Sequence, residues 1–225
     1  MSRSVVTKGS PRCERCQLPP RWCICGGFRA VDCPLKVDVL MHHMEAFRPS
    51  STGHLIRRVI PTAGLHLYRR ERPLDPTAII QRGKALWILH PLGEPLHAAV
   101  PPADLQVLLL DGTWRQAGEM MRAVEPWGRK VALPMTGASR YWLRTQAGEG
   151  KFCTIEALLF LLAALGLTRE HEELRLQFEL HVYAGLWARG AKAKALEYLA
   201  ESPVRTALPG LVADLARHRA RDPGA

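Results

Sequence analysis

The 225 residues are 47% hydrophobic, which is enough to bury one large core, with or without a small appended element, and which excludes a largely disordered chain. The 31 Lys and Arg outnumber the 21 Asp and Glu to give a net charge of +10, and 24 of the basic residues are arginine. This balance favours a polyanionic partner such as nucleic acid.

Charge alone leaves one alternative open, because a composition rich in Ala, Arg, Leu and Pro can place arginines on a merely solvated surface.

No run reaches the roughly 18 to 20 consecutive apolar residues that a membrane helix needs, and the first residues lack the apolar core of a signal peptide. We therefore expect a cytoplasmic protein with no membrane contact.

The first element is a cysteine cluster. The spacing CxxC, six residues, CxC brings together Cys13, Cys16, Cys23 and Cys25. In a reducing compartment such clustering favours a metal over disulfides, and four thiolates complete a tetrahedral, structural zinc site. Redox pairs or free thiols are the alternative. We expect a zinc knuckle over residues 1–30 and a separate domain over residues 31–225.

Four apolar segments predict strands. Residues 35–43 alternate apolar and polar, as in a half-buried strand, whereas residues 85–91 and 105–112 are continuous apolar runs and residues 130–134 form a shorter one. Continuous runs of this length are typical of interior strands in a parallel sheet.

Helical patterns occupy the intervals, at residues 51–60, 113–124 and 154–166. The alternation indicates an α/β fold, with a mostly parallel sheet and flanking helices. Residues 154–166 are apolar almost all round, which predicts a deeply buried helix that stops at Gly166. Gly118 weakens the helix predicted at residues 113–124 by roughly 1 kcal/mol.

The chain after Thr168 predicts more polar helices that cover the fold, at residues 172–187 and 191–200, followed by a frayed tail at residues 221–225. The segment from Glu71 to Gly83 has no clear assignment.

Polar loops follow three of the predicted strands: HHMEAFRPSSTG, HPLGEP and DGTW. Ligands bind beyond the carboxyl ends of parallel strands, so these loops should share one rim. In DGTW, Gly112 permits a tight turn, Thr113 can cap the helix that begins at Trp114, and Asp111 can point into the rim. The alternative is that Asp111 caps the helix and Trp114 lies in the core.

Four ordered motifs now resemble one family. LDGTWRQAGEM is similar to the signature of the DTW-domain proteins, in which Asp111, Thr113 and Trp114 supply the Asp-x-Thr-Trp pattern. CERCQLPPRWCIC resembles their zinc knuckle, FRPSSTGHLIRRVIP their first helix, and SRYWLRTQAGEGKFCTIEA their C-terminal signature. The resemblance runs through most of the chain.

The resemblance implies a tRNA-uridine aminocarboxypropyltransferase with a SPOUT-like fold and a C-terminal knot. In the implied reaction N3 of a tRNA uridine, at variable-loop position 47, attacks the γ carbon of S-adenosylmethionine. It receives the 3-amino-3-carboxypropyl group and methylthioadenosine leaves.

Asp111 and Trp114 are the candidate catalytic residues. Uridine N3 carries a proton at neutral pH, and a positioned carboxylate such as Asp111 can remove it during attack; an electrostatic role beside the sulfonium is the alternative. Trp114 could contact the sulfonium through its ring face or shape the pocket around the arm.

The matched loops supply the other expected contacts. Thr154 is expected to cap its helix, and Glu156 either meets the ligand ammonium or only stabilises the helix terminus. His43 and Glu45 should shape the pocket. The expected S-adenosylmethionine contacts are Leu89, His90, Pro91, Asp111, Gly112, Thr113, Trp114, Ser139, Tyr141, Leu143, Thr154 and Glu156.

We expect tRNA as the partner, with no protein partner evident. The arginines expected to meet its phosphates are Arg48, Arg57, Arg58, Arg140 and Arg144. Two other functions stay open: a noncatalytic zinc-containing RNA-binding protein, and a SPOUT-type RNA methyltransferase that would release S-adenosylhomocysteine.

Overall fold

The computed structural model describes residues 11–96, 100–144 and 150–217, and it divides the chain into two compact units. The larger unit is Arg29–Arg175, and the smaller combines Met1–Phe28 with Leu176–Ala225. The predicted tail at residues 221–225 lies outside the described residues. No described helix is both long and apolar enough to cross a bilayer.

A five-stranded sheet is the centre of the larger unit. All neighbouring strands pair in parallel, in the order β2-β1-β4-β3-β5. The strands are β1 (Lys36–His42), β2 (Gly64–Tyr68), β3 (Ala85–Pro95), β4 (Leu105–Asp111) and β5 (Arg129–Ala132). The predicted α/β class with a parallel sheet is confirmed.

Two strands differ from the sequence prediction. Edge strand β2 was not predicted, because it is short and four of its five residues are only partly buried or exposed. The HPLGEP segment, predicted as a loop, instead continues β3 past a register shift against β5 between Leu89 and Glu94.

The prediction that β1 is half-buried is wrong. Six of its seven residues are buried, because helices cover both faces of the sheet. The polar member of the alternation, Asp38, is buried because His66 Nε2 lies 2.8 Å from Oδ1 and Gln106 donates to Oδ2 at 2.7 Å. The alternation of apolar and polar residues therefore identified the two faces of the strand, but neither face is exposed to solvent.

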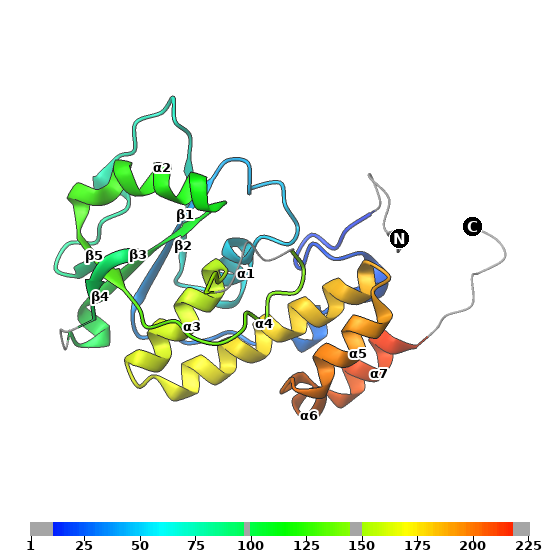
Figure 1. Ribbon diagram of the computed structural model, residues 1–225. Helices are drawn as coiled ribbons and strands as arrows, with labels where there is room; N and C mark the ends of the chain where they lie inside the picture. Colours follow the sequence, from blue (N-terminus) through cyan, green and yellow to red (C-terminus); the bar gives the residue numbers. More distant parts are fainter. Residues whose placement is uncertain (1–10, 97–99, 145–149, 218–225) are drawn as a thin grey trace. The chain divides into compact units, whose positions relative to one another are not determined.

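Three helices flank the sheet, with α2 (Trp114–Val124) on one face and α1 (Thr52–Val59) and α3 (Thr154–Ala164) on the other (Figure 1). Beneath α2, Met120 and Met121 pack with Leu40, Ile88 and Leu108 from three adjacent strands. The residues between these in the strands face α1 and α3 instead, since side chains alternate along a strand.

The helix caps follow the sequence with one correction. Thr113 caps α2 in a capping box with Gln116, and Gly166 ends α3 with φ of +70°, a conformation that glycine adopts easily. Thr154 was expected to cap α3, but Cys153 occupies the cap position. Thr154 is therefore the first helical residue, and its hydroxyl is free to bond to a group outside the helix.

The smaller unit is built from the cysteine-rich segment and the C-terminal helices. These are the end of α4 (Thr168–Ala188), α5 (Lys192–Ala200), α6 (Val204–Ala207) and α7 (Pro209–Ala216). Helix α4 was predicted as a polar covering helix, but its residues from Gln177 to Leu186 are all buried. Gly27 packs tightly there: a Cβ on it would come within 2.6 Å of Leu211 and 3.0 Å of Leu180.

Candidate active site

The sheet order predicts where a ligand can bind. After β1 the chain adds β2 on one side, whereas after β4 it crosses β3 to form β5 on the other side. Strands β1 and β4 are neighbours, with Met41 opposite Asp111 at their carboxyl ends. Connections that leave adjacent strands in opposite directions open a crevice between them, which is the usual ligand site in such sheets.

A cavity of about 310 Å³ lies at this crevice. Its walls come from the middle of β3, the ends of β4 and β5, the starts of α1, α2 and α3, and the segment before α3. Every residue expected to contact S-adenosylmethionine lines this cavity except Leu143 and Glu156. Segments far apart in the sequence thus meet at one place.

Leu143 and Glu156 are buried beside the cavity without lining it. The Glu156 carboxylate accepts hydrogen bonds from Ser139 Oγ at 2.8 Å, from Arg140 N at 2.7 Å and from Cys153 N at 2.8 Å. These three bonds tie the segment around Ser139 to the start of α3. Of its two expected roles, the structure shows the structural one.

Asp111 is buried at the base of the cavity. Its Oδ2 accepts from Ser51 Oγ at 2.8 Å and its Oδ1 from Thr154 Oγ1 at 2.5 Å, so α1 and α3 both hold the carboxylate. Burial raises the pKa of Asp111, and the two hydroxyl bonds offset this only in part. Since Thr113 caps α2, the alternative that Asp111 is the cap is wrong.

The carboxylate is a competent proton acceptor in this position. Each carboxylate oxygen has a second lone pair beyond the one that a hydroxyl occupies. The raised pKa of Asp111 lies closer to neutral pH, and a general base works best when its pKa is near the working pH. Close approach of α1 depends on Gly53, where a Cβ would come within 2.7 Å of Asp111 Oδ2.

Trp114 forms part of the cavity wall and is 41% exposed, so the alternative that it lies in the core is wrong. The Nζ of Lys151 lies 5.6 Å from the centroid of its ring. A cation already lies near this ring in the structure, and the lysine was not among the residues singled out from the sequence.

The five arginines expected to bind RNA divide into two groups. Arg48 and Arg144 line the cavity. The other three lie elsewhere: Arg57 donates to Pro61 O at 3.4 Å, Arg58 donates to His54 O at 3.1 Å, and the Arg140 guanidinium lies 5.7 Å from the Trp142 ring centroid.

Buried Glu45 joins the two arginines of the cavity. Arg48 Nη1 lies 2.8 Å from Glu45 Oε1, and Arg144 Nη2 donates to Glu45 Oε2 at 2.7 Å. Glu45 does not line the cavity itself, but it positions two side chains that do. The segment 139–144 is tied down again where the Tyr141 hydroxyl donates to Ser50 O.

Several lining residues were missed in the sequence. Leu133 and Met135 lie just after β5. Because ligands bind beyond the carboxyl ends of parallel strands, their place in the sequence after a predicted strand indicates the cavity. Lys151 and Phe152 carry no such signal, because only the return of the chain to α3 brings them to the cavity.

The smaller unit holds a candidate metal centre. The Sγ atoms of Cys13, Cys16, Cys23 and Cys25 all lie within 4.8 Å of one another, with Cys13 and Cys25 at 3.5 Å and Cys16 and Cys23 at 3.8 Å. Tetrahedral zinc with bonds of about 2.3 Å requires sulfur separations of about 3.8 Å. The donors therefore fit zinc in type, number and spacing.

The local backbone favours the thiolate at Cys13, whereas burial raises the pKa of Cys16 and of Cys25. Hydrogen bonds from the backbone of Cys16 and Arg15 lower the pKa of Cys13 to about 6. The other two cysteines, Cys33 and Cys153, lie outside this cluster and form no disulfide.

The family model for the DTW domain matches residues 10–184. Two similar curated proteins are both called tRNA-uridine aminocarboxypropyltransferase 2: the Drosophila melanogaster protein is 28% identical over 171 residues, and the Mus musculus protein 26% identical over 171 residues.

These alignments cover 68% and 69% of this chain but only 66% and 56% of the two relatives. No solved structure matches the chain. Because the family match extends over more than three quarters of the residues, from the cysteine cluster into α4, the chain belongs to the DTW-domain family.

Proposed function

We propose that this protein transfers the 3-amino-3-carboxypropyl group of S-adenosylmethionine to N3 of a tRNA uridine, with the variable-loop uridine at position 47 as the expected site. The observation that carries the proposal is the buried carboxylate of the family motif, Asp111, in the wall of a cavity at the sheet's switch point. The names of the two curated relatives support tRNA as the substrate class.

The two sides of the cavity differ in chemistry. Asp111 ends β4, which lies between β1 and β3 in the sheet. On the β3 and β5 side the lining is largely apolar and includes Leu89, Val131 and Leu133, a surface suited to adenosine. On the β1 side it includes Arg48 and Arg144, a surface suited to the charged arm.

The proposed step balances as one displacement. Asp111 takes the N3 proton of uridine while the N3 lone pair forms a bond to the γ carbon. The bond from that carbon to sulfur breaks, its electron pair stays on sulfur, and neutral methylthioadenosine leaves. Holding the two reacting atoms about 3 to 3.5 Å apart is the main task of the cavity.

The finer structural expectations belong to this proposal too. They are the SPOUT-like C-terminal knot, the cytoplasmic location and the boundary near residue 30. Structural zinc on the four cysteines would cross-link the cysteine-rich segment, which packs through Gly27 on α4 and α7 of its own unit.

The test is to incubate the protein with S-adenosylmethionine and unmodified tRNA and to identify the small products by mass spectrometry. We expect methylthioadenosine, together with a uridine that has gained the aminocarboxypropyl group at a position given by nucleoside mapping. S-adenosylhomocysteine would instead identify a methyltransferase, and tRNA binding without either product would identify a noncatalytic RNA-binding protein.

A further inference from the structure

We infer that Arg48 and Arg144, held together by Glu45, form the subsite for the α-carboxylate of the donor's amino-acid arm. The inference deepens the proposed function and rests on it. It also gives these two arginines a small-molecule carboxylate as their ligand in place of the tRNA phosphates expected from the sequence.

The first support is the way the three charges are arranged. Glu45 is 1% exposed; Arg144 donates a hydrogen bond to its Oε2 at 2.7 Å, and Arg48 Nη1 forms an ion pair with its Oε1 at 2.8 Å without hydrogen-bond geometry. A guanidinium has five N–H donors in a planar fork, so neither arginine uses all of its donors on Glu45. The cluster keeps one net positive charge with both arginines in the cavity wall.

The second support is rigidity. The Arg144 guanidinium lies 5.9 Å from the centroid of the Tyr141 ring, and the Tyr141 hydroxyl donates to Ser50 O next to the start of α1. Fixed donors bind a carboxylate with little loss of side-chain entropy, and the two-pronged fork matches its geometry.

The third support is the position relative to Asp111. Arg144 and Asp111 interact electrostatically and line the same cavity. In the arm, three bonds separate the carboxylate carbon from the γ carbon, a span of about 4 Å when extended. A carboxylate anchored at the arginines would hold the γ carbon near Asp111 and leave the methyl group unanchored, which favours arm transfer over methyl transfer.

The experiment compares three ligands by isothermal titration calorimetry on the full-length protein: S-adenosylmethionine, its decarboxylated analogue and methylthioadenosine, which lacks the arm. Wild type should bind S-adenosylmethionine about 10- to 100-fold more tightly than the decarboxylated analogue. Arg144→Gln should remove this preference and leave the affinity for methylthioadenosine unchanged. Arg48→Gln should act in the same direction, and its side chain is 44% exposed.

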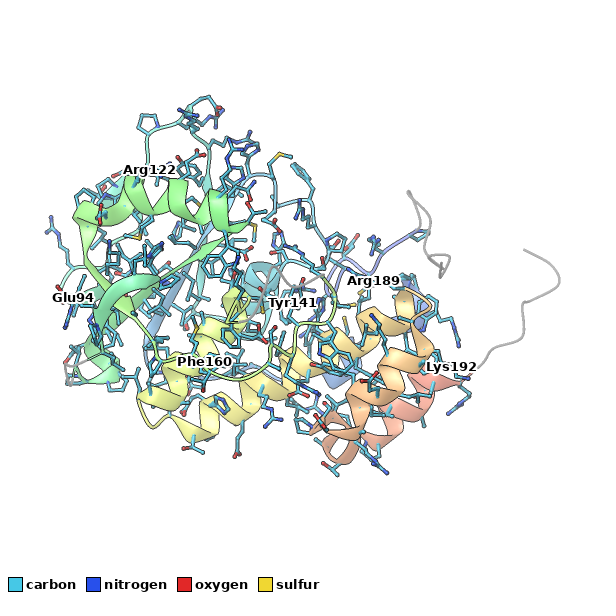
Figure 2. The ribbon with its side chains drawn as sticks, viewed as in Figure 1. Glu94, Arg122, Tyr141, Phe160, Arg189 and Lys192 are labelled. Carbon is cyan, nitrogen blue, oxygen red and sulfur yellow. The ribbon has the colours of Figure 1, made fainter. Side chains whose placement is uncertain are left out.

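Arg129→Gln is the matched control. Arg129 is paired with Glu94 at 2.9 Å and is 34% exposed, close to the 32% of Arg144. Neither Arg129 nor Glu94 lines the cavity. Figure 2 shows Glu94 at the outer edge of the sheet, away from Tyr141. This variant should keep the wild-type preference, and thermal unfolding of all variants monitors folding.

The outcomes separate this subsite from the proposed function. A wild type that binds S-adenosylmethionine, with variants that weaken all three ligands equally, would overturn the subsite and leave the function standing. Unchanged ligand preference with weaker tRNA binding in Arg144→Gln would assign the arginines to phosphate and also overturn it. A wild type that binds none of the three ligands would overturn the proposed donor, and the subsite with it.

Discussion

The Asp111→Asn substitution tests the centre of the proposal because it removes the basic oxygen and preserves the shape of the side chain. The hydroxyls of Ser51 and Thr154, at 2.8 and 2.5 Å, can still bond to an amide, one as donor and the other by turning to accept. Loss of a general base typically costs 10²- to 10⁴-fold, so we expect transfer to fall by about that factor with donor binding largely intact.

The same variant should not lose stability at neutral pH. The pKa of Asp111 is raised above its ordinary 3.8, mainly by burial, which means that folding disfavours the ionised carboxylate. Wild type therefore loses stability as pH rises through the folded-state pKa, whereas the neutral amide does not. Relative to wild type, the variant should gain unfolding free energy from about pH 4 upward, and its stability at pH 7 should be no lower.

Urea unfolding across that pH range, with transfer measured on the same preparations, checks both parts. Asp38→Asn is the matched control, since Asp38 is 1% exposed, accepts two side-chain bonds and lies at the opposite end of the strands. It should lose roughly 1 to 3 kcal/mol of stability but keep transfer per folded molecule. Near-normal transfer by Asp111→Asn, or an equal loss in the control, would refute the assignment of the base.

Four further changes have expected outcomes. Cys13→Ser should lower bound zinc and the stability of the smaller unit, whereas Cys33→Ser should leave the metal content unchanged; equal metal content in both would contradict the zinc site. Gly118→Ala should raise the free energy of unfolding by about 0.5 to 1 kcal/mol in chemical denaturation, because Gly118 lies inside α2 and no atom would contact the added Cβ; a loss would contradict this packing. Gly53→Ala should displace α1 from Asp111 and reduce transfer more than it reduces tRNA binding, which paired rate and filter-binding measurements would show; unaltered transfer would exclude the close packing as a requirement. Binding of tRNA should weaken steeply as salt rises, by a slope of about 0.7 to 0.9 per phosphate contact on logarithmic axes, and a flat response would remove the phosphate contacts.

Much of the fold could be predicted because its signals are local. Apolar runs of strand length located β3, β4 and β5, and the Thr113 cap follows from a hydroxyl residue before a helical pattern. The cysteine spacing identified four thiols that do lie together. Each of these signals depends on residues only a few positions apart.

The errors about β1 and about the cap of α3 have one cause, which is that the deciding contacts are made by residues distant in the chain. Burial of β1 on both faces, and the polar network that makes Asp38 acceptable there, depend on what packs against the strand. The cap of α3 moved by one residue because Thr154 instead donates to Asp111, which is 43 residues away in the chain.

The sequence by itself determined the composition of the site: a motif carboxylate at a strand end, arginines in the flanking loops and four thiols at metal spacing. Only the tertiary structure decided which of these groups act on one another. Arg144 bonds to Glu45 across 99 residues, and Ser51 to Asp111 across 60, so no local pattern predicts either bond. Spacing along the chain sets the energetics of turns, caps and metal loops, whereas partners across the sheet are selected by the burial and hydrogen bonding that arise when all its strands assemble.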